Sequence, residues 1–194
     1  ASLTIARDEA DNADKQATFV FTEYTRLGVK DKSTRPITFC FNGGPGSASL
    51  WLHLGGLSPR RIALLPDELN PTSWELQPNP WSIIDRTDLV FIDPVSTGFS
   101  RPEKHDHKGE FHGYENDLAT ISEFIRRWTA EQRRWSSPQF ILGESYGGIR
   151  GVAVANHLRD EHNYQVEGVI LVSPVIDFQT IRFSESNDLP YILF

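Results

Sequence analysis

The sequence predicts an α/β fold in which helices cover both faces of a mostly parallel β-sheet. Short apolar runs of strand length lie at 36–41, 88–93, 140–142 and 169–172. Between them, residues 115–134 and the stretch from Val152 to Leu158 carry apolar side chains at helical spacing. Strands that alternate with helices form parallel sheets covered on both faces, so we expect all four strands to be buried.

Length and composition limit the classes of function. The chain has 194 residues, of which 39% are hydrophobic and 23% are charged, as in an ordinary globular domain with one core. A net charge of −7 argues against nucleic acid or an anionic membrane surface as the main partner. No apolar run approaches the roughly 18 residues that a membrane-spanning helix needs.

The first half of the chain contains further elements. Residues 17–25 alternate and are rich in aromatic and β-branched side chains, which predicts an antiparallel strand. Prolines and glycines recur over 55–87, where we expect long loops. The single cysteine, Cys40, lies inside an apolar run; it cannot form an intrachain disulfide, and we interpret it as a small buried hydrophobe.

Gly143-Glu144-Ser145-Tyr146-Gly147 matches the pattern G-x-S-x-G. It lies between an apolar strand and a helical pattern, where a nucleophile elbow has to be. Such a turn strains the backbone of the serine, and it presents the hydroxyl at the carboxyl end of the sheet beside the positive end of a helix. We therefore expect Ser145 to be a nucleophile; the alternative is a glycine-rich strand-to-helix turn.

A serine that attacks a carbonyl group needs donors for the oxyanion that forms. One donor is the backbone N–H of the residue after the nucleophile, here Tyr146, and the other comes from a loop after an earlier central strand. The segment 42–46 (Asn-Gly-Gly-Pro-Gly) is such a loop. A plain turn remains possible, and a phosphate-binding loop is disfavoured because no Gly-Lys-Ser/Thr follows.

Three motifs together resemble the serine carboxypeptidase family over about residues 17–194. They are Phe41-Asn42-Gly43-Gly44-Pro45-Gly46-Ser47-Ala48-Ser49-Leu50, Phe91-Ile92-Asp93-Pro94-Val95-Ser96-Thr97-Gly98-Phe99-Ser100 and Gly143-Glu144-Ser145-Tyr146-Gly147-Gly148. With the terminal Asn187-Asp188-Leu189-Pro190-Tyr191, they look closest to the bacterial-type branch. The resemblance implies an α/β-hydrolase fold and a serine-type carboxypeptidase that acts through an acyl-enzyme.

By this resemblance, Gly44 and Tyr146 supply the oxyanion-hole N–H groups. Asn42, Gly43 and Glu144 match the positions that bind the substrate, a peptide with a free C-terminal carboxylate. A protonated Glu144 can donate to that carboxylate, whereas an ionised one would repel it, so binding should favour acidic pH.

Two departures from the family pattern bear on this expectation. The family usually has a second glutamate paired with the first, and Gly56 occupies its place here. Strict carboxypeptidase action and the pH optimum therefore stay open. The well-studied secreted members carry a cysteine where this chain has Ser47, so that disulfide is absent.

The base and acid of a catalytic triad are not evident. In α/β hydrolases they follow the nucleophile in the order acid, histidine. After Ser145 the only histidines are His157 and His162, which we interpret as surface residues, and Asp177 is a candidate acid. The family places both groups farther along. We expect residues 1–177 to be the N-terminal part of the hydrolase domain and 178–194 to begin an insertion or cap, with the triad Asp and His on a missing C-terminal segment or a second chain.

Other readings remain open. His105, Asp106, His107, Glu110 and His112 are metal-ligand types at short spacing, but their charged surroundings indicate a solvated loop, and we expect neither metal nor cofactor. An esterase or acyltransferase on the same scaffold, or an inactive hydrolase-like binding protein, are alternative functions. The absence of disulfide pairs and of N-x-S/T sites fits a bacterium and leaves localisation, secreted or periplasmic included, undecided.

Overall fold

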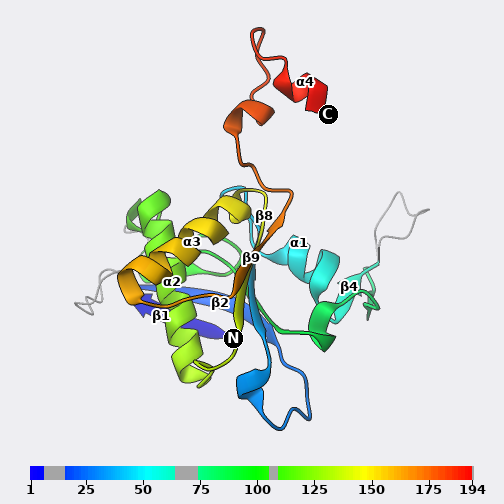
Figure 1. Ribbon diagram of the computed structural model, residues 1–194, viewed down its shortest axis with the longest axis vertical. Coiled ribbons are helices and arrows are strands. Elements are labelled where there is room, and N and C mark those ends of the chain that lie inside the picture. The colour runs from blue at the N-terminus through cyan, green and yellow to red at the C-terminus, as the bar shows by residue number, and fades with distance from the viewer. Residues whose placement is uncertain (7–15, 64–73, 105–108, 194) are drawn as a thin grey trace.

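The computed structural model describes residues 1–6, 16–63, 74–104 and 109–193 (Figure 1). One sheet forms the centre of the molecule, with the strand order β1-β2-β6-β3-β8-β9, and β7 pairs with β2. The strands are β1 (Ser2–Ala6), β2 (Gln16–Tyr24), β3 (Ile37–Phe41), β6 (Asp88–Ile92), β7 (Arg101–Pro102), β8 (Gln139–Glu144) and β9 (Gly168–Val172). β6, β3, β8 and β9 are parallel, and β2 runs antiparallel to β6. The α/β fold and the antiparallel strand near 17–25 are confirmed.

The central strands β3 and β6 are buried along their whole length. Successive side chains of a strand point to opposite faces, and the core divides accordingly. Phe39 and Phe41 join the large cluster beneath the helices, whereas Cys40 packs with Phe91 and Leu142 on the other face. Burial raises the pKa of the Cys40 thiol, in keeping with a structural side chain.

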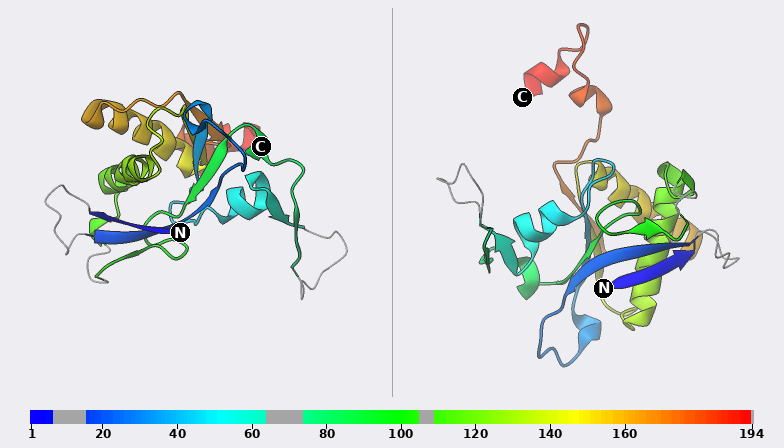
Figure 2. Two further views of the ribbon diagram at one scale, coloured as in Figure 1. Left: turned by 90° about the horizontal axis from the view of Figure 1, so that it is seen from below. Right: turned by 180° about the vertical axis from the view of Figure 1, so that it is seen from behind.

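Two long helices cover one face of the sheet, α2 (Tyr114–Glu131) and α3 (Tyr146–His162) (Figure 2). The apolar stripe of α2 is buried as its spacing predicts, including Phe124 and Trp128. The opposite face carries α1 (Leu50–Leu52) and the helical turn His53–Leu57. None of the helices in the described part of the chain combines the length and the hydrophobicity of a membrane-spanning segment.

The region 55–87 has more structure than the long loops that its prolines and glycines predict. β4 (Arg60–Ile62) pairs with β5 (Leu76–Pro78) in a small antiparallel hairpin, and Ile83–Asp85 forms a helical turn. Each strand has only three residues. An element this short leaves no periodic pattern to detect in the sequence.

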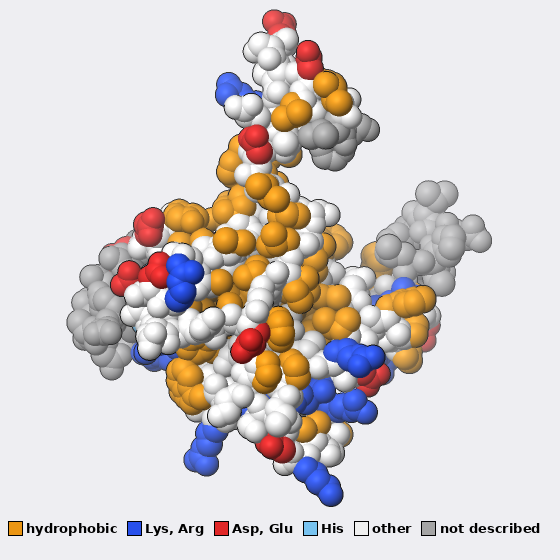
Figure 3. Space-filling view, in the orientation of Figure 1, with side chains coloured by type: hydrophobic (Ala, Val, Ile, Leu, Met, Phe, Trp, Pro, Cys, Tyr) orange, Lys and Arg blue, Asp and Glu red, His pale blue; other side chains and the backbone are white. Residues whose placement is uncertain are grey.

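The prediction that 169–172 is buried is wrong. The strand β9 forms and pairs with β8, but Ile170 and Leu171 are each 41% exposed. Among the described residues β9 has no second neighbouring strand, and its apolar side chains lack the cover that the other strands have. Figure 3 shows hydrophobic side chains gathered along this part of the molecule and the segment that follows it.

The chain after β9 leaves the body of the molecule (Figure 1). It contains the short turn Phe178–Ile181 and the helix α4 (Leu189–Leu193). Several of its large apolar side chains are exposed, among them Ile176, Phe183 and Ile192.

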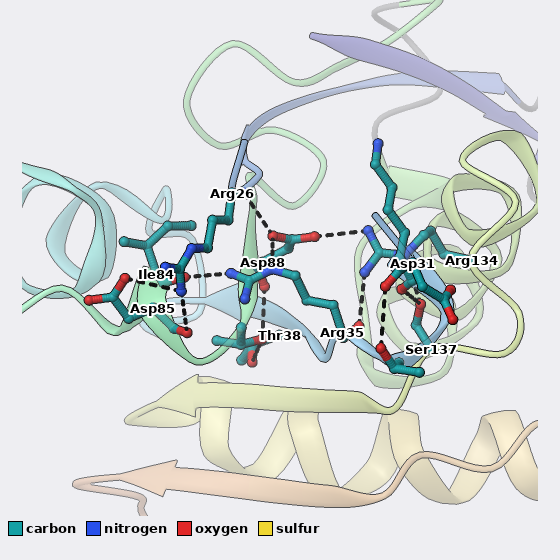
Figure 4. Close-up of polar contacts among 12 residues, drawn as sticks. Arg26, Asp31, Arg35, Thr38, Ile84, Asp85, Asp88, Arg134 and Ser137 are labelled. Atoms are coloured by element: carbon teal, nitrogen blue, oxygen red, sulfur yellow. Dashed lines mark hydrogen bonds and ion pairs between the residues drawn. The ribbon is translucent and has the colours of Figure 1, made fainter. Parts of the chain in front are cut away.

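A buried network of charges lies at the amino-terminal ends of the parallel strands (Figure 4). The Asp88 carboxylate accepts from Arg35 Nε at 2.7 Å and from Arg134 Nη1 at 2.8 Å. Burial by itself would raise the Asp88 pKa, but the hydrogen bonds from Arg35, Arg134 and the Arg26 amide outweigh it and lower the pKa. The network therefore ties the start of β6 to the segments before β3 and after α2.

Candidate active site

Ser145 stands at the turn between β8 and α3 with φ 57° and ψ −123°, a conformation that strains any residue other than glycine. Its amide donates to the Val172 carbonyl at 2.9 Å, and its own carbonyl accepts from the Gly148 amide at 2.9 Å. The first N–H groups of a helix have no partner within the helix, so the turn presents backbone donors next to this serine. The strained turn expected at Ser145 is therefore present.

The glycine loop after β3 packs directly against this turn. A Cβ atom on Gly43 would stand 2.5 Å from the Tyr146 nitrogen and 2.7 Å from the Glu144 carbonyl oxygen. Gly44 has φ +108°, which favours glycine. The Ser47 amide closes the loop on the Gly43 carbonyl at 3.1 Å. The backbones of segments 42–46 and 143–147, which lie far apart in the sequence, are therefore in contact.

Asn42 and Glu144 are also in contact. Asn42 Nδ2 donates to a Glu144 carboxylate oxygen at 3.0 Å, and Asn42 Oδ1 accepts from the Leu52 amide at 3.1 Å. Gly56, at the place of the family's second glutamate, has no side chain to pair with Glu144, and its carbonyl accepts from Asn79 Nδ2 at 2.7 Å. Among the residues that the structure describes, the hydrogen-bond partner of the Glu144 side chain is therefore an amide and not a second acid.

Arg150 of α3 is a residue that the sequence analysis did not identify. It is 2% exposed, and its guanidinium pairs with Asp117 of α2 at 2.7 Å and lies over the Tyr146 ring, 5.0 Å from the centroid. Burial, followed by the negative charge of Asp117, raises the Tyr146 pKa. The sequence does contain a signal for Arg150, because it is an arginine that lies next to Gly151 on the glycine-rich, buried face of the helix. No nearby residue, however, indicates which groups the Arg150 side chain contacts.

The motif at 91–100 contacts the motif at 41–50. Asp93 accepts from the Ser49 amide at 2.8 Å, just after the glycine loop, and burial raises the pKa of this carboxyl group. Thr97 Oγ1 donates to the Pro94 carbonyl at 2.8 Å, which folds the segment after β6 into a tight turn.

A pocket of about 520 Å³ opens beside the elbow. His112 Nε2 and Ser96 Oγ lie 2.9 Å apart on its wall. The full lining is Pro45, Gly46, Pro94, Val95, Ser96, Thr97, Phe111, His112, Gly113, Tyr114, Asp117, Tyr146 and Arg150. The pocket is thus bounded by the glycine loop, the second motif and the start of α2.

In the described residues no histidine is hydrogen-bonded to the Ser145 hydroxyl. The rings of His157 and His162 meet edge to face on α3, with their centroids 5.6 Å apart, and the Asp177 carboxylate accepts from the Gln179 amide at 2.8 Å. His105, Asp106 and His107 lie outside the described residues. Among the residues that the structure does describe, no group of three or more His, Cys, Asp or Glu side chains is placed so that it could hold a metal ion.

A mostly parallel sheet with a strained serine at a strand-to-helix turn is the arrangement of the α/β-hydrolase fold. Solved structures share this fold: carboxypeptidase KEX1 of Saccharomyces cerevisiae aligns with a TM-score of 0.73 and 22% identity, covering 99% of this chain and 44% of that one. The peroxisomal α/β-hydrolase Lpx1 of the same yeast gives 0.53 and 13% identity, covering 91% and 44%. The serine carboxypeptidase family model matches residues 8–187, and the chain belongs to this family.

Curated relatives are similar in the same region. The pheromone-processing carboxypeptidase KEX1 of S. cerevisiae strain JAY291 is 28% identical over 192 residues, which cover 91% of this chain and 25% of the relative. Serine carboxypeptidase-like 45 of Arabidopsis thaliana is 27% identical over 161 residues, covering 76% of this chain and 32% of the relative. The chain therefore spans a quarter to a third of these relatives. The bacterial-type branch stays a prediction.

Proposed function

We propose that the protein is a serine-type carboxypeptidase that removes the C-terminal residue of a peptide through an acyl-enzyme at Ser145. The observation that carries the proposal is the contact between the strained Ser145 turn and the glycine loop, in which Gly43 leaves no room for a Cβ atom. Family membership supports the carboxypeptidase activity.

In this mechanism Ser145 Oγ attacks the scissile carbonyl carbon, and the carbonyl oxygen becomes an oxyanion. The N–H groups of Gly44 and Tyr146 donate to that oxygen, which stabilises charge that appears only in the transition state. The triad histidine takes the proton of Ser145 Oγ and delivers it to the leaving nitrogen as the tetrahedral intermediate collapses. The C–N bond breaks, the C-terminal amino acid departs with a free amine, and an ester remains on Ser145. The same histidine then takes a proton from water, which attacks the ester, releases the shortened peptide and regenerates Ser145.

The triad acid and histidine belong, in this proposal, to a C-terminal segment outside the chain or to a second chain. Support comes from the relatives, of which the chain covers 25% to 32%. Residues 1–177 are then the N-terminal part of the hydrolase domain, and 178–194 begin an insertion or cap. The departure of this last segment from the body of the molecule is consistent with the division (Figure 1).

Recognition of the free C-terminus is assigned to Asn42, Gly43 and Glu144. The Asn42 amide already holds the Glu144 carboxylate at 3.0 Å, which is the geometry in which the two could share a substrate carboxylate.

The test compares the rate at which the natural full-length polypeptide hydrolyses a peptide with a free C-terminal carboxylate and the same peptide amidated at its C-terminus. The carboxypeptidase should hydrolyse the free acid at least about tenfold faster, because only the acid presents a carboxylate to Asn42 and Glu144. Ser145→Ala should abolish hydrolysis, and Ser136→Ala, at an exposed serine, should not. Equal rates on acid and amide would instead favour an esterase or acyltransferase, and no turnover of either would favour an inactive binding protein.

A further inference from the structure

Arg150 joins three parts of the site through one buried side chain. Its Nη1 donates to the Asn42 carbonyl at 2.9 Å, and its Nε donates to the Asp117 carboxylate at 2.7 Å. Its guanidinium also stacks on the ring of Tyr146, at 5.0 Å from the centroid. The start of the glycine loop, α2 and the first residue of α3 are therefore held by the same group.

Stability alone gives little reason for this arrangement. The loss of hydration on burying two charges largely offsets their attraction, and well-packed apolar side chains often hold helices together as well. An apolar side chain at position 150 could not donate to the Asn42 carbonyl. That carbonyl belongs to the peptide bond before Gly43, whose backbone abuts the Tyr146 nitrogen.

Asn42 is held from both faces of the sheet. On the α1 side, its side chain is bound by Glu144 and the Leu52 amide. On the helix side, its carbonyl is bound by Arg150. With both ends fixed, the peptide plane between Asn42 and Gly43 cannot rotate freely, and the direction of the following Gly44 N–H is constrained in turn.

We propose that Arg150 is a positioning residue that sets the oxyanion-binding N–H groups of Gly44 and Tyr146 relative to Ser145. The inference rests on the proposed function. Lysine at this position would keep a positive charge, but its single ammonium group lacks the planar fork that reaches two partners while stacking on a ring.

The expected effect of Arg150→Lys is a loss in kcat of about 10- to 100-fold with KM changed less than about threefold. Donors that act on the developing oxyanion affect the transition state more than the bound substrate, and small displacements of such groups are costly. Asp117→Asn, which keeps an acceptor for Arg150 Nε, should lower kcat in the same direction but less.

Arg134 supplies a matched control at the opposite end of the sheet (Figure 4). It is 3% exposed, pairs with Asp88 at 2.8 Å and donates to the Arg35 carbonyl at 2.9 Å. Arg134→Lys therefore disturbs a carbonyl contact and an ion pair that is buried at least as deeply as Arg150–Asp117, without touching the glycine loop. Its melting temperature should decrease at least as much as that of Arg150→Lys, with kcat unchanged.

The experiment measures peptide hydrolysis, melting temperature and the rate of labelling by a fluorophosphonate in the natural full-length polypeptide and these three variants. Slow labelling and low kcat confined to the Arg150 and Asp117 variants support the inference. Equal losses in Arg134→Lys, or unimpaired labelling of both Arg150→Lys and Asp117→Asn, would overturn it while leaving the proposed function intact. If Arg150→Lys does not fold, Asp117→Asn decides. No labelling of the unmodified protein would overturn the proposed function itself.

Discussion

Single residues show how far local patterns determine this site. The strained conformation of Ser145 follows from a motif of a few residues, which is why the sequence predicts it, whereas the close approach at Gly43 depends on a second, distant segment. The role of Arg150 depends on Asn42 and Asp117, which lie on other elements. No local pattern reports such contacts, so Arg150 becomes evident only in the folded chain.

Gly43→Ala should reduce the rate of Ser145 labelling by about 10- to 100-fold. The new Cβ atom would stand 2.5 Å from the Tyr146 nitrogen, and since the obstacle is backbone, the loop itself has to move away from the elbow. Gly55→Ala is the control, because a Cβ atom there meets nothing within 4 Å. Labelling kinetics measure both; equal rates in the two variants would contradict the proposed packing.

At the scale of elements, periodicity predicts that both long helices exist, but in α3 Val152 is 52% exposed and the buried face carries Gly151 and Val154 instead. Helices α2 and α3 have enough residues for a repeat to be visible, and the buried strands β3 and β6 are recognisable as uninterrupted apolar runs. The hairpin of β4 and β5 is too short for one, and the exposure of β9 depends on which strands lie beside it. The first miss reflects the length of the strands, and the second reflects information that no single segment contains.

The end of α2 offers a test of local backbone strain. Arg133 has φ 54°, and it occupies the position after the helix cap where glycine is favoured, with the Arg134 amide bonded to the Thr129 carbonyl. Arg133→Gly should raise the free energy of unfolding by about 0.5–1 kcal/mol, because relief of strain exceeds the entropy that glycine adds to the unfolded chain. Asn163→Gly, at φ 48°, should gain less, since asparagine tolerates this conformation. Denaturant unfolding measures both changes, and a loss of stability in Arg133→Gly would count against the argument.

At the scale of the whole molecule, the two ends of the parallel strands carry different kinds of structure: the candidate site lies at one end and a buried ion-pair network at the other. The carboxyl ends carry the strained serine and the glycine loop, and the amino ends are closed by the Arg35–Asp88–Arg134 network. The fold class, and the end of the sheet at which each motif lies, are predictable from the order of strands and helices along the chain. The buried network is not, because arginine and aspartate at segment ends look like ordinary surface residues in a sequence.

Acid should destabilise the fold through Asp88. Its folded-state pKa lies below the ordinary 3.8, so the stability it contributes is present above pH 3.8 and is lost as the pH falls through the lowered pKa. Asp88→Asn should cost about 3 kcal/mol at neutral pH and flatten the acid dependence. Asp160→Asn, at an exposed ion pair, should change neither noticeably. Unfolding measured from pH 2 to 7, with about equal acid slopes in Asp88→Asn and the unmodified protein, would contradict this account.

The central claim is that one serine hydroxyl and two backbone amides from separate segments act on the same carbonyl group. A crystal structure of the full-length protein after reaction with a fluorophosphonate tests it most directly. We predict a bond from phosphorus to Ser145 Oγ, with a phosphonyl oxygen about 2.7–3.1 Å from both the Gly44 and the Tyr146 nitrogens. An adduct on another residue, or an oxygen that faces neither amide, would contradict the account.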